Sequence, residues 1–544
     1  MNPNNAPTHF IKPIISKPGI QRDGTIFDSD CYTDGLWVRF FRNRPKKIGG
    51  YQVLSPGTTA KVQGMYNVPI DDNIIYYIGR STGISSLNVY QGSAYPEMDH
   101  TISEFPNNNK YLWVFDTVIK PSANVAYLLN QPIPSAENLN SNSLSSIYWM
   151  DTADSNDTTK KVNVLLEKFS DSQVEPVPVQ SSGGFVVLPP FLFTYSNNGI
   201  IGFAEFNFES NNVISVKEID YSAPVNRKIV AARVLGGGTP SILFWSLDQL
   251  VRAVFVGGNA VFAYIPNKTR ISIIAQNSIV EKDGKFFWIG DGEFYISNGE
   301  SVSILPNVYN KDFFFTNLNR KVANKIVGFV QPLWSEIWWQ VPLGDSTENN
   351  HVIILNYENG FNNCYFYDTP LDRTFGISSN VLFPYPVMAD SKLKTIALVN
   401  QGEQQALVPT YPIWQHEFGV DEIVNSQVNA VESYFTTRVI TIFEDNPGLD
   451  NYIQLLGFEP DIQQVGDLIL IISNKTYAAY PTEEQLGGTF IIPDPNIITK
   501  LPQAKTDCMV LGRQIRVTVK ATGKGVNYYF CKTEAKMGIG PRNQ

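Results

Sequence analysis

Turn-forming dipeptides divide the segment from Val280 to Pro306 into pieces too short for helices. Asp283-Gly284, Asp291-Gly292 and Asn298-Gly299 follow one another at short intervals. Asp-Gly and Asn-Gly accept the positive φ angles of tight hairpins, and the pieces between them are rich in aromatic and β-branched residues. The spacing therefore predicts an antiparallel meander of short strands.

The same pattern returns from Ile229 to Ile265 and from Ile326 to Asp368, where apolar stretches such as SILFWSL and SEIWWQV alternate with turn signals. Each segment offers about four strands, which is typical of propeller blades. The segments are not alike at fixed positions and carry no WD or kelch signature. A series of stacked sheets or sandwiches is therefore the alternative to a propeller.

The predicted fold class is all-β: a β-propeller-like domain of short antiparallel meanders, then a C-terminal β-sandwich or barrel-like domain. We predict an N-terminal arm and strand over residues 1–60, the propeller-like domain over 61–412 and the C-terminal domain over 413–544. The stretch NQGEQQALVPTYP (400–412) indicates the boundary. Thr316–Ile326 is predicted to be a short helix, and the polar stretch 135–161 a loop.

Within the C-terminal part, the segment RQIRVTVKA alternates in character. Its apolar residues and its polar residues would lie on opposite faces of a strand, which predicts a sheet with one wet face. The apolar members are Ile515, Val517 and Val519, and the polar members are Arg516, Thr518 and Lys520.

Composition agrees with this class. Charged residues make up 17% of the 544 residues, below the roughly 25% that is usual, and aromatic residues make up 12%. The net charge of −9 does not favour phosphate-neutralising nucleic-acid binding, although a wall that repels DNA would let a duplex slide. The amino terminus lacks a signal-peptide pattern and no apolar run is long enough to span a bilayer, so we expect a soluble protein made in a cytosol.

The sequence offers little recognisable chemistry. The cysteines Cys31, Cys364, Cys508 and Cys531 have no short spacing, which excludes zinc ribbons and CxxC motifs and predicts reduced thiols. No GxSxG elbow, phosphate loop or HExxH motif occurs. We therefore predict no enzyme, no cofactor and no metal. A pair of catalytic carboxylates from distant strands stays open, because sequence singles out no pair.

Two local features have alternative interpretations. The cluster His416, Glu417 and Asp421 can bind a cation or act as an acid/base group, or it can be a polar turn between domains. Trp338 and Trp339 are adjacent on a predicted strand and face opposite sides, so one must pack in a second layer or an interface. Exposed aromatics elsewhere can stack on sugars, and a subunit contact is an equally economical interpretation.

A basic run lies near the amino terminus, in WVRFFRNRPKK. Five cations there can contact DNA phosphates or a subunit interface, or they can protect a solvated edge strand from aggregation. These candidate residues are Arg39, Arg42, Arg44, Lys46 and Lys47.

Several segments, in order, resemble one family. They are CYTDGLWVRFFRNRPKKIGGY, PPFLFTYSNNGIIGFAEFN, FTNLNRKVANKIVGFVQPLWSEIWWQVP and GRQIRVTVKATGKGVNYYF. Together they are similar to the tail nozzle family of short-tailed bacteriophages, also called tail tubular protein B or tail hub, and to head-completion proteins that stabilise packaged DNA. The chain departs from the family pattern at Tyr51, where Trp is more usual, and in the long polar stretch 135–161.

The resemblance implies a virion structural protein with no catalytic residues. It implies a homohexameric ring below the portal and the adaptor, a tail tubular protein A-like partner, with tail fibres or spikes attached. Double-stranded DNA would be retained by the ring and pass through its lumen at ejection. The protein would be assembled in the host cytoplasm and located in the virion tail. The alternatives are a receptor-binding or glycan-degrading tail propeller and a plug that grips DNA through the basic run.

Overall fold

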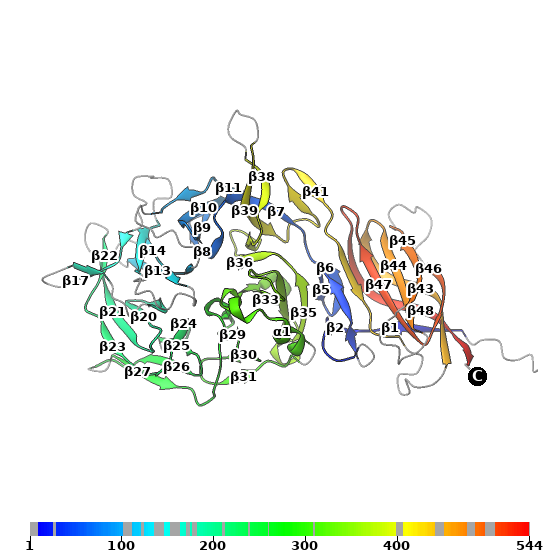
Figure 1. Ribbon diagram of the computed structural model, residues 1–544, viewed down its shortest axis with the longest axis horizontal. Helices are drawn as coiled ribbons and strands as arrows, with labels where there is room; N and C mark the ends of the chain where they lie inside the picture. Colours follow the sequence, from blue (N-terminus) through cyan, green and yellow to red (C-terminus); the bar gives the residue numbers. More distant parts are fainter. Residues whose placement is uncertain are drawn as a thin grey trace, which may run out of the picture.

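The computed structural model describes residues 9–25, 29–101, 111–120, 125–134, 146–152, 164–169, 174–176, 182–208, 213–237, 240–258, 261–307, 310–398, 406–440, 451–475, 485–494 and 506–542. Nearly all of its regular structure is β-sheet, which confirms the predicted all-β class. Figure 1 shows a ring of sheets and, beside it, a second body of two sheets. No helix in these ranges is long and apolar enough to cross a bilayer.

The ring contains seven described sheets, and the first three come from its amino-terminal half. The first sheet contains β8 (Val62–Ile70), β9 (Asn73–Arg80), β10 (Gly83–Tyr90), β11 (Ser93–Ala94) and β12 (Met98–Asp99). The second contains β13 (Tyr111–Lys120), β14 (Val125–Pro134), β15 (Tyr148–Asp151) and β16 (Val164–Leu165). The third contains β17 (Glu167–Phe169), β18 (Val174–Pro176), β19 (Gly184–Leu188), β20 (Phe191–Tyr195), β21 (Ile201–Phe208), β22 (Ile214–Val216) and β23 (Asp220–Ser222).

The next three sheets are the meanders predicted from the turn spacing, and each is confirmed. The fourth contains β24 (Ile229–Leu235), β25 (Ser241–Ser246), β26 (Leu250–Phe255) and β27 (Phe262–Pro266). The fifth contains β28 (Val280–Lys282), β29 (Lys285–Ile289), β30 (Phe294–Ser297) and β31 (Val302–Ile304). The sixth contains β32 (Val327–Gln331), β33 (Glu336–Val341), β34 (His351–Asn356) and β35 (Tyr365–Pro370).

The seventh sheet joins distant parts of the chain. It contains β36 (Arg373–Ile377), β37 (Val387–Asp390), β38 (Lys394–Leu398), β39 (Ala406–His416), β40 (Glu422–Val424) and β41 (Gln427–Asn429), together with β7 (Tyr51–Thr58). Because β7 lies between β39 and β40, the segment just before the first sheet completes the last one.

Contacts between strands of successive sheets close the ring. β8 contacts β13, β13 contacts β19, and β19 contacts β24. The 3-10 turn η4 (Gln276–Ser278) connects β24 to β32, and β36 contacts both β32 and β8. The described sheets therefore follow one another around a ring. Apolar clusters lie between neighbouring sheets, as between the fifth and sixth sheets around Phe294 and Trp339.

The second body consists of two sheets packed face to face. One contains β46 (Thr506–Gly512), β43 (Asn451–Val465), β48 (Asn527–Arg542), β6 (Arg44–Lys47), β5 (Val38–Phe41) and β1 (Phe10–Ile14). The other contains β4 (Asp34–Leu36), β42 (Ser433–Thr436), β47 (Gln514–Ala521), β44 (Leu468–Lys475) and β45 (Gln485–Ile492). Leu470, Val517 and Val519 on one sheet and Phe530 and Met537 on the other share one buried core. The predicted alternation on β47 is confirmed.

The observed arrangement differs from the predicted divisions of the chain. Residues 1–60 do not form a separate arm in the part described: β1, β4, β5 and β6 belong to the sandwich and β7 belongs to the ring. The predicted boundary at residues 412/413 falls inside β39, which continues to His416. Strand pairing over long sequence distances causes both differences. Most of the predicted loop 135–161 lies outside the described residues, and β15 occupies its apolar centre.

The single described α-helix lies earlier than predicted. α1 spans Lys311–Asn317, and residues Arg320–Lys325 form the 3-10 segment η5 instead of continuing the helix. The side chain of Asn319 accepts a hydrogen bond from the Lys321 backbone N–H, which starts a new turn. Asparagine competes with helical hydrogen bonding in this way. Two further 3-10 turns are η6 (Pro332–Trp334) and η7 (Phe361–Asn363).

Trp338 and Trp339 connect the two bodies through opposite faces of β33. Trp339 packs in the cluster between the fifth and sixth sheets, and its indole N–H donates to the Ser278 carbonyl (2.8 Å). Trp338 packs in the cluster that contains the sandwich core. Both side chains are fully buried. The prediction that the two indole side chains face different layers is confirmed. The second layer is the junction between the ring of sheets and the sandwich.

Candidate functional site

The predicted basic run forms the hairpin β5–β6 at the edge of a sandwich sheet. Arg42 and Asn43 make its two-residue loop, and both have positive φ, as tight hairpins require. The hairpin faces the ring, because the Tyr365 hydroxyl on β35 donates to the Phe40 carbonyl (2.6 Å). The run is therefore placed at the junction of the two bodies.

Arg39 is the centre of this junction. Its Nε and Nη2 atoms donate to the two carboxylate oxygens of Glu336 on β33 (3.1 and 3.2 Å). Its Nη1 and Nη2 atoms donate to the two oxygens of Glu417, just after β39 (2.9 and 2.5 Å). The guanidinium also lies over the ring of Trp334, 4.2 Å from its centroid. One cation thus connects a sandwich strand to two separate parts of the ring.

The carboxylate of Glu336 accepts further hydrogen bonds. The Tyr367 hydroxyl donates to one oxygen (2.5 Å) and the Trp338 indole N–H to the other (2.8 Å). Burial raises the pKa of Glu336, and Arg39 opposes this rise. Burial also disfavours the charge on Arg39, but Glu336 and Glu417 together raise its pKa above the ordinary value. The group is an almost fully satisfied buried ionic network.

Lys47 is buried at the other end of the hairpin. Its Nζ atom donates to the Val526 carbonyl (2.9 Å) and lies 3.9 Å from Asp421. Burial lowers the pKa of Lys47 to about 8, and Asp421 partly opposes this. Asp421 in turn accepts from the Gly525 backbone N–H (2.6 Å).

The three remaining cations are nearer to solvent. Arg42 is exposed, and its backbone N–H donates to Glu358 (2.9 Å). Lys46 is half-buried over the ring of Trp334, 4.4 Å from its centroid, and burial and Arg39 lower its pKa. Arg44 is half-buried.

Two predictions about the basic run are therefore corrected. Arg39 and Lys47 cannot contact DNA or an outside subunit, because both are buried and bonded within the chain. β5 does lie at the edge of its sheet, but it is covered by the ring and is not a solvated strand. Arg39 is paired across the hairpin with Lys46, and Lys47 with Val38, so the two buried cations lie on opposite faces and both faces are covered.

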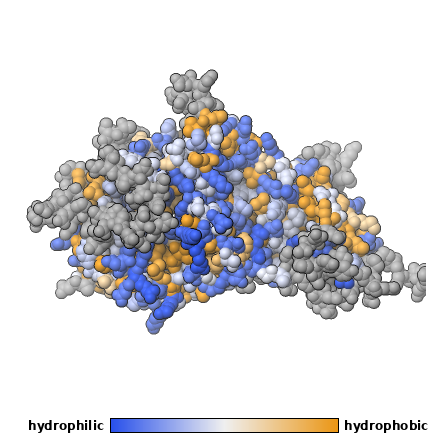
Figure 2. Space-filling view, viewed as in Figure 1, coloured by the Kyte–Doolittle hydropathy of each residue, from blue (hydrophilic) through white to orange (hydrophobic). Residues whose placement is uncertain are grey.

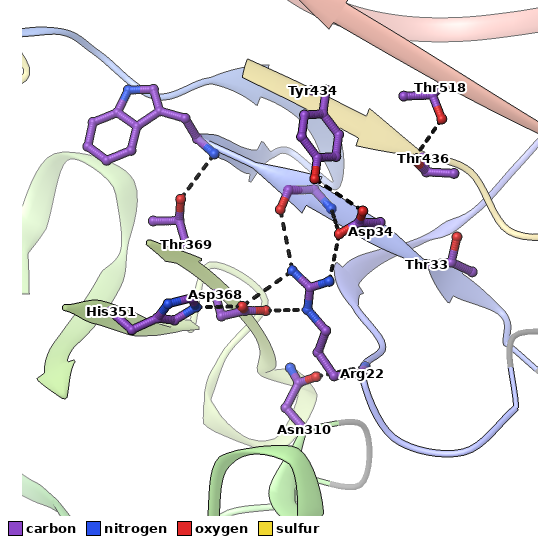
Figure 3. Close-up of polar contacts among 12 residues, drawn as sticks. Arg22, Thr33, Asp34, Asn310, His351, Asp368, Thr369, Tyr434, Thr436 and Thr518 are labelled. Carbon is purple, nitrogen blue, oxygen red and sulfur yellow. Dashed lines mark hydrogen bonds and ion pairs between the residues drawn. The ribbon is translucent and has the colours of Figure 1, made fainter. Parts of the chain in front are cut away.

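Figure 3 shows a second arginine network at the junction, centred on Arg22. The sequence did not predict it. Arg22 donates from Nε to Asp368 Oδ1 on β35 (2.9 Å) and from Nη1 to Asp34 Oδ1 on β4 (2.6 Å). His351 bonds the other oxygen of Asp368 (2.8 Å), and the Tyr434 hydroxyl donates to Asp34 (3.1 Å). No local signal predicts this group, since its members are isolated in the sequence.

The predicted cluster of His416, Glu417 and Asp421 is not a joint site. His416 accepts from Arg373 Nε (3.0 Å) and stacks on Tyr51, and burial and Arg373 hold its pKa well below the ordinary value. Glu417 and Asp421 bind Arg39 and the Gly525 N–H instead. The alternative of a polar turn between two bodies describes the arrangement. Among the described residues, no group of three or more His, Cys, Asp and Glu side chains is placed to hold a metal.

The chemistry of this junction is that of a fixed connection. Its buried charged groups are paired with one another or bonded to the backbone, and none of Arg39, Glu336 and Lys47 is accessible to a substrate. The four cysteines are free thiols, with Cys31 and Cys508 buried. No family model matches the chain, and no curated protein matches it.

Proposed function

We propose that the chain is a structural subunit of a short-tailed phage tail: one of six copies in a nozzle ring that retains packaged DNA and conducts it at ejection. The observation that carries the proposal is the buried Arg39 network. It fixes a sandwich and a ring of sheets in one orientation, as a subunit whose role is to maintain shape requires. The ordered resemblance to the nozzle family supplies the tail and the six copies.

An exposed apolar face on the sandwich supports contact with another subunit. Met509 and Leu511 on β46 point outward from the sheet and are 77% and 44% exposed. Ile11 on β1 also points away from the core. Figure 2 shows apolar residues on the surface of the sandwich. Exposed apolar residues gathered on one face are typical of protein interaction sites.

Native mass spectrometry and electron microscopy of the purified chain, alone and with its adaptor, test the proposal. We expect closed rings of six copies. The double variant Met509→Asp/Leu511→Asp should remain folded but lose the rings, while Leu393→Asp, at an exposed apolar position of the ring body, should retain them. A chain that stays monomeric in every condition, adaptor included, contradicts the proposal.

The DNA-gripping plug now depends on three cations. Arg42, Arg44 and Lys46 can be replaced with serine without removing the buried pairs of Arg39 and Lys47. If these residues hold DNA, virions with the triple variant should assemble normal tails and leak their genomes. If tails do not assemble, the three residues serve an interface.

A pocket on the first sheet favours a second candidate, a receptor-binding or glycan-degrading role. Its volume is about 770 Å³, and it extends to Met150–Thr152 of the second sheet. Tyr90 and the 52% exposed Tyr95 line it together with Asp71 and Asp72. Exposed aromatic rings beside carboxylates are suited to stack on sugars and bind their hydroxyls. A glycan array and a capsule-degradation assay with wild type and Tyr95→Ser decide the matter: no glycan binding and no cleavage removes this candidate.

A further inference from the structure

A cavity lies at the centre of the ring, where the strands β8, β13, β19, β24, β32 and β36 and the turn η4 meet. Its volume is about 360 Å³, near the lower end of the range that is usual for small-molecule sites. Every sheet contributes to its wall, the fifth through the turn η4 that precedes it. Representative lining residues are Tyr66, Phe115, Phe185, Arg233, Gln276 and Phe375. The cavity is distinct from the junction with the sandwich.

Arg233 on β24 brings a positive charge to this cavity. Its Nη1 atom donates to the Ala232 carbonyl (2.8 Å) and its Nη2 atom to the Gln276 carbonyl (3.4 Å). None of the ion pairs found among the described residues includes Arg233, and the charges of Tyr195 and Asp116 act on it without forming such a pair. Burial lowers the pKa of Arg233, which shows that its charge is poorly solvated. An anion that enters the cavity would therefore stabilise the charge of this guanidinium.

Asp116 on β13 is the acidic residue among those that line the cavity. Its two oxygens accept from the backbone N–H groups of Thr117 and Val187 (both 2.8 Å), so it connects the second and third sheets. Burial raises the pKa of Asp116 to about 6, against these two hydrogen bonds and the charge of Arg233. Asp116 therefore changes charge in a range of pH where Arg233 does not.

The other titratable groups that face this pair are two tyrosines. Burial raises the pKa of Tyr66, on the first sheet, and of Tyr195, on the third, to about 12 each. Both hydroxyls stay neutral when Asp116 titrates. The charge of the cavity at neutral pH is thus set by Arg233 and Asp116 alone among the described lining residues.

Aromatic rings form much of the remaining wall. Trp113 and Phe115 are stacked with their centroids 5.8 Å apart, and Tyr66 stacks on the same Phe115 at 6.2 Å. Phe185 and Phe375 line the cavity from the third and seventh sheets. An inorganic anion would leave these faces uncovered, whereas an apolar group bonded to the anion would cover them.

We propose that this cavity is a binding site for a small organic carboxylate, whose carboxylate accepts hydrogen bonds from Arg233 and whose apolar body contacts Phe115, Phe185 and Phe375. The inference does not depend on the role of the chain in a phage tail, since the cavity lies within one copy.

Isothermal titration calorimetry of the full chain tests the site with benzoate, with its neutral relative benzamide and with inorganic phosphate. Benzoate should bind saturably, and benzamide and phosphate at least about tenfold more weakly. Arg233→Gln should weaken benzoate binding about tenfold to a hundredfold, the loss expected for a charged hydrogen bond. Arg270→Gln, which removes an exposed arginine outside the cavity, should bind benzoate like wild type.

The pH dependence of benzoate binding provides a separate test. Protonation of Asp116 removes a negative charge beside the ligand, so benzoate should bind wild type more tightly as the pH falls from about 7.5 to about 5.5. In Asp116→Asn the affinity should be higher at neutral pH and nearly independent of pH in this range. Circular dichroism checks that each variant is folded, and the comparison of benzoate with benzamide on wild type requires no variant.

Four results would overturn the inference. One is the absence of saturable benzoate binding, and another is equal binding of benzoate and benzamide. The third is unchanged benzoate binding in a folded Arg233→Gln. If phosphate binds as well as benzoate, the apolar body has no role and an organic ligand is rejected.

Discussion

Arg39 and Glu336 form an ion pair in which each side chain is only 1% exposed, although 297 positions of sequence separate them. Arg39 belongs to a sandwich sheet and Glu336 to the ring. Each would become an unpaired buried charge if the two bodies rotated against each other, and buried charges are tolerated in proteins only when they are paired. The pair therefore specifies how the two bodies fit together.

Replacing Arg39 with methionine should destabilise the chain strongly. The substitution leaves Glu336 buried and reduces the partners of Glu417, and breaking a buried pair in this way costs about 3–5 kcal/mol. Urea unfolding followed by tryptophan fluorescence measures the loss, with the exposed Arg42→Met as the matched control, expected to change stability by less than about 0.5 kcal/mol. A loss of less than about 1 kcal/mol for Arg39→Met would show that the network does not hold the bodies together.

Lys47 should make the free energy of unfolding depend on pH in the alkaline range. Its folded-state pKa is lowered to about 8, so between that value and its ordinary pKa of roughly 10.4 the unfolded chain binds more protons than the folded chain. Stability from this residue therefore rises with pH across that window and is constant below it, with a slope of at most about 1.4 kcal/mol per pH unit. Unfolding free energies of wild type and Lys47→Met, measured at several pH values, should diverge in this sense. Parallel pH profiles would contradict the lowered pKa.

Local pattern was sufficient to predict the fourth, fifth and sixth sheets. Each is a meander closed by nearby turns, such as Asp283-Gly284 with its two positive φ angles. The destinations of the amino-terminal strands could not be predicted in this way. β4 pairs with β42 and β7 with β39, far along the chain, and nothing in a short strand identifies its distant partner.

The candidate site shows the same division between local and distant information. The sequence identified the basic run but not the burial of Arg39, which depends on Glu336 and Glu417 from two other segments. The role of Arg22 could not be predicted from the sequence, because its partners Asp34 and Asp368 meet it only in the folded chain.

Gly50 should not tolerate a side chain. A Cβ atom at this position would lie 2.2 Å from the Asp421 carbonyl oxygen and 2.4 Å from the Asp421 nitrogen, both backbone atoms. The backbones are held at this distance by hydrogen bonds between Gly50 and the segment Phe418–Gly419. Gly50→Ala should therefore reduce stability by at least about 2 kcal/mol, within the range seen for strained or overpacked sites.

The control for this prediction is Gly236→Ala. A Cβ atom at Gly236 would extend into open space, with no packing atom within 4 Å, and the φ angle of this glycine is not positive. Alanine should therefore change stability by no more than about 0.5 kcal/mol. Thermal unfolding of both variants compares them directly. Equal melting temperatures would mean that the loop 417–421 moves away from Gly50 without loss.

Asp368 should contribute stability that is lost in acid. Burial alone would raise its pKa, but the hydrogen bond from His351 and the charge of Arg22 outweigh burial and hold the pKa below its ordinary value. For a carboxyl whose pKa is lowered by folding, the stabilisation is complete above the unfolded pKa of about 3.9 and disappears as the pH falls through the folded value.

Asp368→Asn should be less stable than wild type by about 2–4 kcal/mol at neutral pH, because Arg22 loses a charged partner. The difference should shrink below about pH 4, whereas the exposed Asp345→Asn should follow wild type throughout. Urea midpoints of the three proteins at neutral and acid pH measure this, and a difference between wild type and Asp368→Asn that persists unchanged in acid would exclude the ion pair as its cause.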